Sequence, residues 1–399
     1  MSKKLESEVW NVERCAGCGA CVVACSKCIV KFEGDKEHPS RKDIWKNVGL
    51  TKSKLDVCHF CEMEGVKFCE LSCPRLVEEW PDGPVLRNVL VRTAGKKKTN
   101  NPNEIITNLL AGAMQARMID GAVISDIDRW TLIPYPLVAT SISELVESAG
   151  NQYIWSPTLQ GLKEAIYKMG LKKVAVVGTP CVMQALDRIE KADAKALKHI
   201  AERIKLKVGV FCSGVYTQAA LEEISESLKI PISSLQSISV SQKDDSLSVA
   251  TYSGEKKEMK LSEATKLIRA GCGRCYDLLS EASDISIGPI GAGEGHSVAI
   301  LRTSAGANAL DNAANLKLLE TKHGVDEKAL KTAKEAKKKR KRAEMIDGLK
   351  ILMLEALRDP ARIEEARKKF TEIYYQKTTN ERKEKEPEGR YGCGTCSLC

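Results

Sequence analysis

The chain has 399 residues, a hydrophobic fraction of 43%, a charged fraction of 29% and a net charge of +9 at pH 7. These values are ordinary for a globular protein and leave room for two or three domains. No stretch approaches the roughly 20 apolar residues of a membrane-spanning helix, and the opening MSKKLESEVW has no apolar signal-peptide core. The 16 cysteines are therefore expected to be metal ligands in a reducing cytoplasm and not a disulfide framework.

Residues 1–80 hold nine of the cysteines and little periodic apolar sequence. This composition is typical of a small domain that metal holds together in place of a large core. The segment WPDGPVLRN at 80–88 contains two prolines and a glycine, and it predicts a linker or turn. We therefore expect a first domain over residues 1–80.

Eight of these cysteines form two runs with ferredoxin-like spacing. The first run has the bacterial spacing C-x2-C-x2-C-x3-C, and the second keeps this order with a longer loop between its second and third cysteines. The runs are Cys15, Cys18, Cys21 and Cys25, then Cys58, Cys61, Cys69 and Cys73. Three thiolates on one tight loop can hold three irons of a [4Fe–4S] cluster, so the runs predict two clusters.

In two-cluster ferredoxins the fourth cysteine of each run ligates the other cluster. The predicted ligand sets are therefore Cys15, Cys18, Cys21 and Cys73 for one cluster, and Cys58, Cys61, Cys69 and Cys25 for the other. Structural zinc is the alternative, but zinc usually takes two CxxC pairs or mixtures of cysteine and histidine. One departure from the usual first run is Ser26, which stands where proline is common. Because oxygen damages exposed clusters, we expect an anaerobic source.

Residues 81–320 show the alternation of an α/β domain. Helical spacing occurs over residues 104–119, 141–149, 159–169 and 218–228. Short apolar runs predict strands over residues 121–125, 173–178, 205–212, 284–288 and 297–303. Apolar strands between helices indicate a sheet that is at least partly parallel. Residues 237–261 alternate with period two around turn residues, which predicts an antiparallel hairpin or meander.

Residues 321–399 are expected to form a charged helical tail. The basic run over 337–342 has two interpretations, a nucleic-acid patch and a solvated helix face, and we favour the solvated face. The chain ends in a CxxCxxC made by Cys393, Cys396 and Cys399. This group could bind a fourth metal, with Cys28 or a partner's ligand, or could belong to a disordered thiol-rich end.

Four further cysteines are scattered along the α/β region. They are Cys181 in VVGTPC, Cys212 in VGVFC, and Cys272 and Cys275 in GCGRC. Each lies at a predicted strand end or in a glycine-rich loop, so the four thiols can converge at one edge of the sheet. The alternative is that they are buried structural cysteines, which are common.

Five segments then carry a family resemblance: AGNQYIWSPTLQGLKEA (149–165), GTPCVMQALDRI (178–189), KLKVGVFC (205–212), GCGRCYDLLSEASDISIG (271–288) and HSVAILRTSAG (296–306). In this order they resemble the beta subunit family of coenzyme F420-reducing hydrogenases and dehydrogenases, over roughly residues 85 to 310. The resemblance implies a domain that binds FAD and one [4Fe–4S] cluster, with Cys181, Cys212, Cys272 and Cys275 as the cluster ligands. Members often carry a ferredoxin-like extension, as this chain does.

The resemblance also implies flavin contacts, from Thr179, Gly288, Gly291, Gly293 and Arg302. A flexible loop is the alternative for the glycine-rich stretch 288–295, and a salt bridge is the alternative for Arg302. The family usually has a glycine pair where Asn103 and Glu104 open a helix here, and Glu104 would repel a phosphate at that position. No catalytic residue is assigned.

These features predict an α/β protein, α+β overall, with a two-cluster ferredoxin-like domain at 1–80, a flavin and cluster domain at 81–320 and a basic tail at 321–399. We expect an oxidoreductase subunit that passes electrons between coenzyme F420 and larger subunits of a redox complex, through FAD and three [4Fe–4S] clusters. The alternatives are a flavoprotein that uses ferredoxin as donor or acceptor, and a flavin-free adapter. The expected setting is the cytoplasm of a methane-producing archaeon, with no nucleic acid and no membrane span, while attachment to a membrane complex stays open.

Overall fold

The computed structural model describes residues 3–26, 28–32, 38–41, 61–77, 80–95, 99–148, 153–241 and 246–340, and the single positions 353, 359, 363, 364 and 367. Residues 1–338 form one compact unit and residues 339–399 a second. Among the helices that the structure describes, none is long and apolar enough to cross a membrane.

An eight-stranded sheet, ordered β15-β5-β14-β13-β9-β8-β6-β7, organises the first unit. The four central strands run parallel to one another, and the outer strands pair antiparallel. The predicted partly parallel sheet is thus confirmed. The strands are β5 (Arg87–Thr93), β6 (Gly121–Ile127), β7 (Pro134–Ala139), β8 (Val174–Gly178), β9 (Ile204–Val210), β13 (Ile285–Gly288), β14 (Ser297–Leu301) and β15 (Leu319–Lys322).

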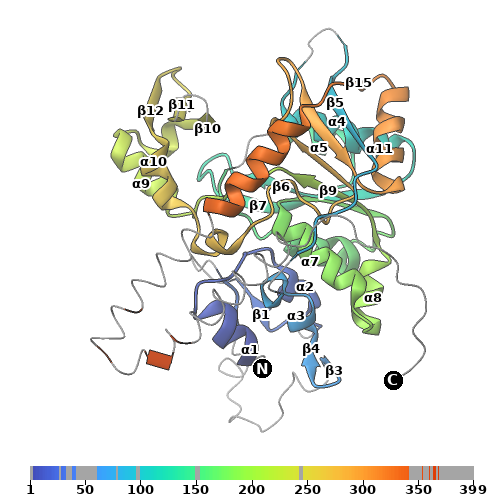
Figure 1. Ribbon diagram of the computed structural model, residues 1–399, viewed down its shortest axis with the longest axis vertical. Helices are drawn as coiled ribbons and strands as arrows, with labels where there is room; N and C mark the ends of the chain where they lie inside the picture. The colour runs from blue at the N-terminus through green and yellow to red at the C-terminus, as the bar shows by residue number, and fades with distance from the viewer. Residues whose placement is uncertain are drawn as a thin grey trace, which may run out of the picture. The chain divides into compact units, whose positions relative to one another are not determined.

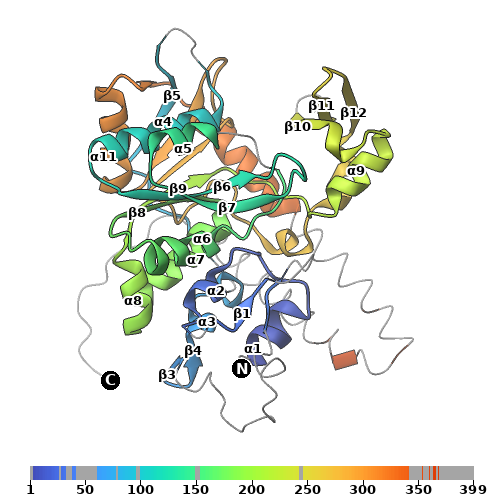
Figure 2. The same ribbon diagram turned by 180° about the vertical axis from the view of Figure 1, so that it is seen from behind.

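Helices cover both faces of this sheet (Figures 1 and 2). On one face lie α4 (Pro102–Gln115), α5 (Ile142–Glu147) and α11 (Ser304–Asn315). On the other lie α6 (Leu159–Lys163), its π-helical continuation η3 (Glu164–Lys168), α7 (Pro180–Lys191) and α8 (Lys195–Ala201). Central strands buried on both faces need continuous apolar runs, which β8 supplies with the fully buried Val174, Ala175 and Val176.

The predicted helices at 104–119, 141–149 and 159–169 correspond to α4, α5 and the α6–η3 pair, while α7 and α8 are additional. The helix α4 begins at Pro102, where a proline has no amide hydrogen to lose, and the side chain of Asn101 accepts a hydrogen bond from the Asn103 amide. The helix α5 begins with a capping box between Ser141 and Glu144. These local signals fix where both helices start.

A smaller antiparallel sheet forms beside the large one. Its three strands are β10 (Leu235–Ser241), β11 (Ser246–Thr251) and β12 (Lys256–Lys260), flanked by α9 (Ala220–Leu228), α10 (Leu261–Ala264), η4 (Ile232–Ser234) and η5 (Thr265–Leu267). This arrangement confirms the predicted meander and the predicted helix at 218–228. The sheet and α9 enclose a separate core that includes Leu221, Ile224, Leu247 and Val249.

The N-terminal segment is made of very short elements. They are α1 (Lys3–Leu5), η1 (Glu6–Trp10), α2 (Ala20–Ala24), β1 (Val30–Lys31), β2 (Ser40–Arg41), β3 (Glu62–Met63), β4 (Val66–Lys67), α3 (Phe68–Leu71) and η2 (Pro74–Leu76). Its own small core contains Leu5, Trp10 and Ile29 together with cysteines. The helix α2 also buries Ala20 and Val23 against α6 and α7, so this segment packs directly on the large domain.

A further helix runs over residues 327–340 of the described chain. The carboxylate of Asp326 accepts a hydrogen bond from the Ala329 amide at its start, and Leu330 packs on Leu90 and Val298 of the sheet. The basic run was expected to be a solvated face, and this is wrong for Lys337, which is only 4% exposed. The exposed Lys339 and Arg340 fit the expectation. Residues 341 and 342 lie outside the described residues.

Candidate functional site

The four scattered cysteines meet at the carboxyl edge of the parallel strands. Cys181 lies in the first turn of α7 directly after β8, and Cys212 follows β9. Cys272 lies in the 3-10 helix η6 (Ala270–Arg274), and Cys275 follows it. All four line a single cavity. Loops at this edge of a sheet are where α/β proteins usually build their binding sites.

The thiols of this third set influence one another, and Cys275 is buried while the other three cysteines are partly buried. Burial raises the pKa of Cys212 to about 12, and the neighbouring thiols of Cys272, Cys275 and Cys181 add to the rise. Burial also raises the pKa of Cys181, whose sulfur lies 3.1 Å from the Thr179 hydroxyl. Four thiols this close to one another can lose their protons and act together as thiolate ligands when a cationic iron–sulfur core binds.

Two buried cations face this third set. Burial acts to raise the pKa of the Cys275 thiol, but the charges of Lys337 and Arg75 outweigh burial and lower it. Burial acts to lower the pKa of Arg75, but the thiols of Cys275, Cys181 and Cys272 raise it overall. The Arg75 Nε atom is buried without a hydrogen-bond partner among the described residues. The donors and charges therefore fit an anionic group with four thiolate ligands, such as a [4Fe–4S] cluster.

The first ferredoxin-like ligand set is also brought together. Burial raises the pKa of Cys18 and of Cys21 well above the usual value, and Cys15 and Cys73 contribute to both shifts. Burial raises the pKa of Cys73 to about 11, although Arg75 and Arg188 oppose the rise. The chain thus places Cys73, from the second run, beside three cysteines of the first run.

The second ligand set is described only in part. Cys25 and Cys61 are buried and Cys69 is partly buried, while Cys58 lies outside the described residues. The hydroxyl of Ser26 lies 2.8 Å from the sulfur of Cys61. A proline at this position would have no hydroxyl to place there, so the departure at Ser26 gives this thiol a hydrogen-bonding neighbour. The terminal Cys393, Cys396 and Cys399 also lie outside the described residues.

Among the described residues, no three His, Cys, Asp or Glu side chains form a group suited to a single metal ion. Of the described thiols, Cys18, Cys21 and Cys73 are buried in the first set and Cys275 is buried in the third. The exposed Cys28 lies outside the three sets and has a positive φ of 55°.

The loop of the first ferredoxin-like set is fixed against the third set. The Trp155 indole donates to the Gly17 carbonyl at 3.0 Å, and Arg269 donates to the Ala16 carbonyl at 2.7 Å. The Arg269 guanidinium also lies 4.3 Å from the centre of the Trp155 ring, a cation–π contact. Gly17 has a φ of +69°, and a side chain there would overlap Trp155. This packing holds the first loop beside Cys181, whose sulfur lies 4.0 Å from the Ala16 carbonyl oxygen.

Away from the thiols, the cavity has a mixed lining. Asn103, Ser125, Thr158 and Thr179 supply polar groups, and the apolar part of the wall comprises Ile106, Leu110, Ile124, Val177 and Val210. An apolar wall with a few polar groups is typical of small-molecule and cofactor sites. Glu104 is not among the lining residues, so the carboxylate that the sequence placed against a phosphate does not border this cavity.

Of the five predicted flavin contacts, Thr179 alone lines the cavity. Gly288 ends β13 beneath the Phe211 ring, and Gly291 packs against the segment before the 327–340 helix. Arg302 is 3% exposed and is held by Glu281, by the Ser286 hydroxyl and by the Leu279 carbonyl. The salt-bridge interpretation of Arg302 therefore agrees with these contacts. Gly293 has open space around its Cα and is likewise absent from the lining.

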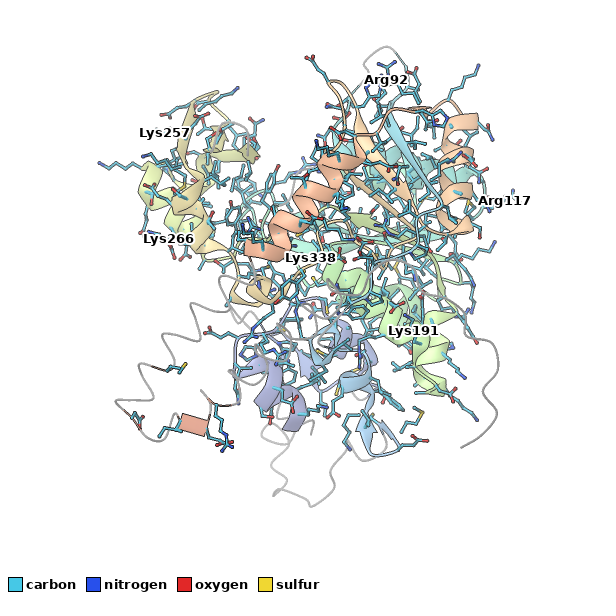
Figure 3. All side chains as sticks on the ribbon, in the orientation of Figure 1. Arg92, Arg117, Lys191, Lys257, Lys266 and Lys338 are labelled. Carbon is cyan, nitrogen blue, oxygen red and sulfur yellow. The ribbon has the colours of Figure 1, made fainter. Side chains whose placement is uncertain are left out.

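Sequence reasoning missed four residues of this site: Arg75, Trp155, Arg269 and Lys337. Arg75 carries a usable signal, because it follows Cys73 and Pro74 at the end of a ligand run. Trp155 lies in one of the five segments that carry the resemblance, but its pattern assigns no contact to it, and Arg269 and Lys337 lie in segments whose pattern indicates only a loop or a charged helix. Figure 3 shows labelled basic side chains such as Arg92, Arg117, Lys191 and Lys257 on widely separated elements of the first unit. These labelled side chains do not gather on a single element.

Comparison with known proteins agrees with this fold. Two family models match, the N-terminal and C-terminal parts of the coenzyme F420 hydrogenase/dehydrogenase beta subunit, over residues 105–163 and 171–327. The chain is 30% identical to coenzyme F420 hydrogenase subunit beta of Methanothermobacter thermautotrophicus, over 55% of this chain and 76% of that protein. The chain therefore belongs to the coenzyme F420 hydrogenase/dehydrogenase beta subunit family, as the sequence resemblance predicted.

Two further relatives extend the comparison. The uncharacterized protein MJ1349 of Methanocaldococcus jannaschii is 31% identical over 85% of this chain and 97% of its own length. A chain of the solved F420-reducing [NiFe] hydrogenase complex from Methanosarcina barkeri superimposes with a TM-score of 0.58 at 25% identity, covering 68% of this chain and 94% of that one. Residues 1–104 lie outside both family models.

Proposed function

We propose that this chain passes electrons between coenzyme F420 and a redox partner complex, and that it holds one FAD and three [4Fe–4S] clusters. The observation that carries the proposal is the third thiol set. Four thiols from three separate segments line one cavity with two buried cations, and the loop of the first ferredoxin-like set is fixed against them. A cavity and adjacent cluster sites are the parts that a flavin-to-cluster electron path requires.

Under this proposal each ligand set has a defined place. Cys181, Cys212, Cys272 and Cys275 would hold the third cluster, and the ferredoxin-like sets would hold the other two, in the combinations given above. Bound FAD would supply the exchange between two-electron hydride transfer and one-electron transfer.

The residues of the chain would position these groups and exclude water. Ile106, Leu110 and Ile124 would supply apolar contacts to the flavin, and Thr179, whose hydroxyl lies 3.1 Å from the Cys181 sulfur, would supply a polar one. Trp155 and Arg269 fix the Ala16–Gly17 backbone, and with it the separation of the first and third sets. A short, fixed separation is what makes one-electron transfer between two centres efficient.

A related flavoprotein that exchanges electrons with ferredoxin is the second candidate. The observation that favours it is Asn103, which borders the cavity at a position where the family usually has glycine.

A single-turnover experiment on anaerobically purified protein separates these candidates. The absorbance of bound FAD is followed after mixing with reduced coenzyme F420 and, in a parallel sample, with reduced ferredoxin. Rapid reduction by reduced coenzyme F420 is expected. Reduction by ferredoxin alone would select the second candidate, and a preparation that binds clusters but no flavin after reconstitution with FAD would select the flavin-free adapter.

A further inference from the structure

Two cationic side chains reach the third thiol set from outside the α/β segments that the family models cover. Arg75 comes from the N-terminal segment and is 7% exposed, while Lys337 comes from the 327–340 helix and is 4% exposed. The matched segments span residues 105–163 and 171–327, so neither residue lies in them. Burying a charge costs free energy unless an opposite charge or hydrogen bonds compensate it. A negative group is therefore expected beside these two cations.

The ammonium group of Lys337 is held in a fixed position. Its Nζ atom donates to the carbonyl oxygens of Cys212 and Asp277, both at 2.6 Å, and lies 3.8 Å from the sulfur of Cys275. The carboxylate of Asp277 is bonded elsewhere, to the Gln184 amide and to the backbone amide of Glu281. The backbone carbonyls therefore orient Lys337, and its charge acts on Cys212 and Cys275 of the thiol set as well as on the nearby Asp277 carboxylate.

The guanidinium of Arg75 stands between two thiol sets. One nitrogen donates to the Gly271 carbonyl at 3.3 Å, and the side chain also hydrogen-bonds to Cys275. Its charge acts on Cys73 of the first set as well as on Cys181, Cys272 and Cys275 of the third. Only Pro74 separates Arg75 from Cys73 in the sequence. The charge of Arg75 thus acts on both sets.

A cluster held by four thiolates is negatively charged, and the negative charge increases by one when the cluster accepts an electron. A cation fixed nearby in a poorly polarisable interior stabilises the reduced form more than the oxidised form, because the Coulomb attraction grows with the charge. Removing such a cation makes reduction harder. The potential of an iron–sulfur cluster depends on net charge and on hydrogen bonds to its sulfurs in this way.

We propose that Lys337 and Arg75 set the reduction potential of the third cluster, and that Arg75 does so for the first cluster at the same time. This inference rests on the proposed function, since it needs clusters at both thiol sets. The step that it concerns is the uptake of one electron by a cluster, with no atom transferred. Lys337 acts on one cluster, whereas Arg75 couples the potentials of two adjacent clusters.

The test is a redox titration of anaerobically purified full-length protein, followed by electron paramagnetic resonance with iron content measured in parallel. The variants are Lys337→Gln, Arg75→Gln and the charge-keeping Lys337→Arg and Arg75→Lys. The matched control is Lys334→Gln, one turn earlier on the same helix, because Lys334 bonds to Asp82 and Glu281 instead of to the thiol set.

Lys337→Gln is expected to shift one cluster to a more negative potential, and Arg75→Gln to shift two. The charge-keeping variants and Lys334→Gln are expected to stay near the wild-type values. If a glutamine variant loses about four irons per chain, one [4Fe–4S] cluster, while its charge-keeping partner retains them, the positive charge is needed to assemble the cluster, which also supports the inference.

Unchanged potentials in both glutamine variants at full iron content would overturn the inference and leave the proposed function standing. Equal loss of iron in the glutamine and charge-keeping variants would also overturn the inference. Retention of the cluster would then depend on the shape of the side chain and not on its charge. Absence of iron from the wild-type protein would instead contradict the proposed function itself.

Discussion

At the scale of single residues, Cys181 is the most informative of the proposed ligands because it lines the cavity, belongs to the third thiol set and lies beside the first loop. Its sulfur lies 3.1 Å from the Thr179 hydroxyl and 4.0 Å from the Ala16 carbonyl oxygen. Cys181→Ala removes one of four thiolates, so the third cluster is expected to be lost. Iron should fall from about 12 to about 8 atoms per chain, and single-turnover flavin reduction should persist.

Met183→Leu is the matched control for Cys181→Ala. Met183 is fully buried two positions along α7, and leucine keeps its volume, so iron content should not change. Steady-state reduction of a one-electron dye is the second measurement, and it should collapse in Cys181→Ala alone. Wild-type iron content in Cys181→Ala would mean that Cys181 is a small buried hydrophobe and that the third ligand set is wrong.

The sequence could predict the thiols of this site but not the cations around them. Cysteine spacing identifies ferredoxin-like runs because the cluster itself demands that spacing. Lys337 sits in a run of basic residues whose pattern is the same for a solvated face and for a buried contact. Its burial depends on where the 327–340 helix docks, and that depends on contacts between segments far apart in the sequence.

At the scale of elements, η6 and the first ferredoxin-like loop pack with no room between them. A methyl group on Gly271 would overlap the carbonyl group of Cys15, and Gly271 needs no unusual φ. Gly271→Ala should therefore push η6 away from the first loop and destabilise the protein by about 1–3 kcal/mol. Anaerobic denaturant unfolding measures this change.

Gly293→Ala provides the comparison, because nothing lies within 4 Å of the added methyl and no positive φ is required. It should leave the unfolding midpoint unchanged. If Gly271→Ala and Gly293→Ala unfold at the same denaturant concentration, the contact between η6 and the Cys15 loop is looser than described here.

A second prediction concerns Glu281, which ties three segments together. Its carboxylate pairs with Arg302 at 3.1 Å and with Lys334 at 2.6 Å, and it accepts the Gly83 amide at 3.0 Å. The Glu281 side chain is 9% exposed and that of Arg302 is 1% exposed. Glu281→Gln leaves a buried guanidinium without its counter-charge, so a loss of about 3–5 kcal/mol is expected in anaerobic unfolding.

The surface pair between Glu320 and Arg92 serves as the control for Glu281→Gln. These side chains are 40% and 32% exposed, so Glu320→Gln should cost less than about 1 kcal/mol. An equally small cost for Glu281→Gln would show that the Glu281 network does not stabilise the fold. In that case Arg302 would again be open to a role in binding a flavin phosphate.

Strong periodicity explains which elements could be predicted. Apolar runs identified β6, β8, β9, β13 and β14, and alternation identified the meander. The edge strand β7 was not predicted, because its sequence PYPLVA contains two prolines, which sheets tolerate at edges but which argue against a strand. The helix α7 was also not predicted, although Pro180 at its first position is a typical start signal.

At the scale of the whole molecule, the ferredoxin-like segment and the α/β region could each be recognised from the sequence. The hydrophobic core that they share could not be predicted from it. Ala20 and Val23 of α2 are buried with Leu159, Leu162 and Met183 of the α/β region. Lys163 adds hydrogen bonds to the carbonyls of Val22 and Cys25. The periodicity and spacing of residues do not reveal an interface of this kind. Each helix face, taken alone, has the same apolar pattern as a face that packs in an ordinary core. The division into three domains stays a prediction.

The central claim is that the chain holds iron–sulfur clusters and a flavin in one continuous electron path. The most direct test is the iron, zinc and flavin content of protein purified without oxygen, together with its absorbance and paramagnetic spectra after reduction. The account predicts about 12 iron atoms per chain, from three [4Fe–4S] clusters, and one FAD; a fourth metal site at the terminal cysteines would raise the iron to about 16. Zinc without iron in such a preparation would contradict it.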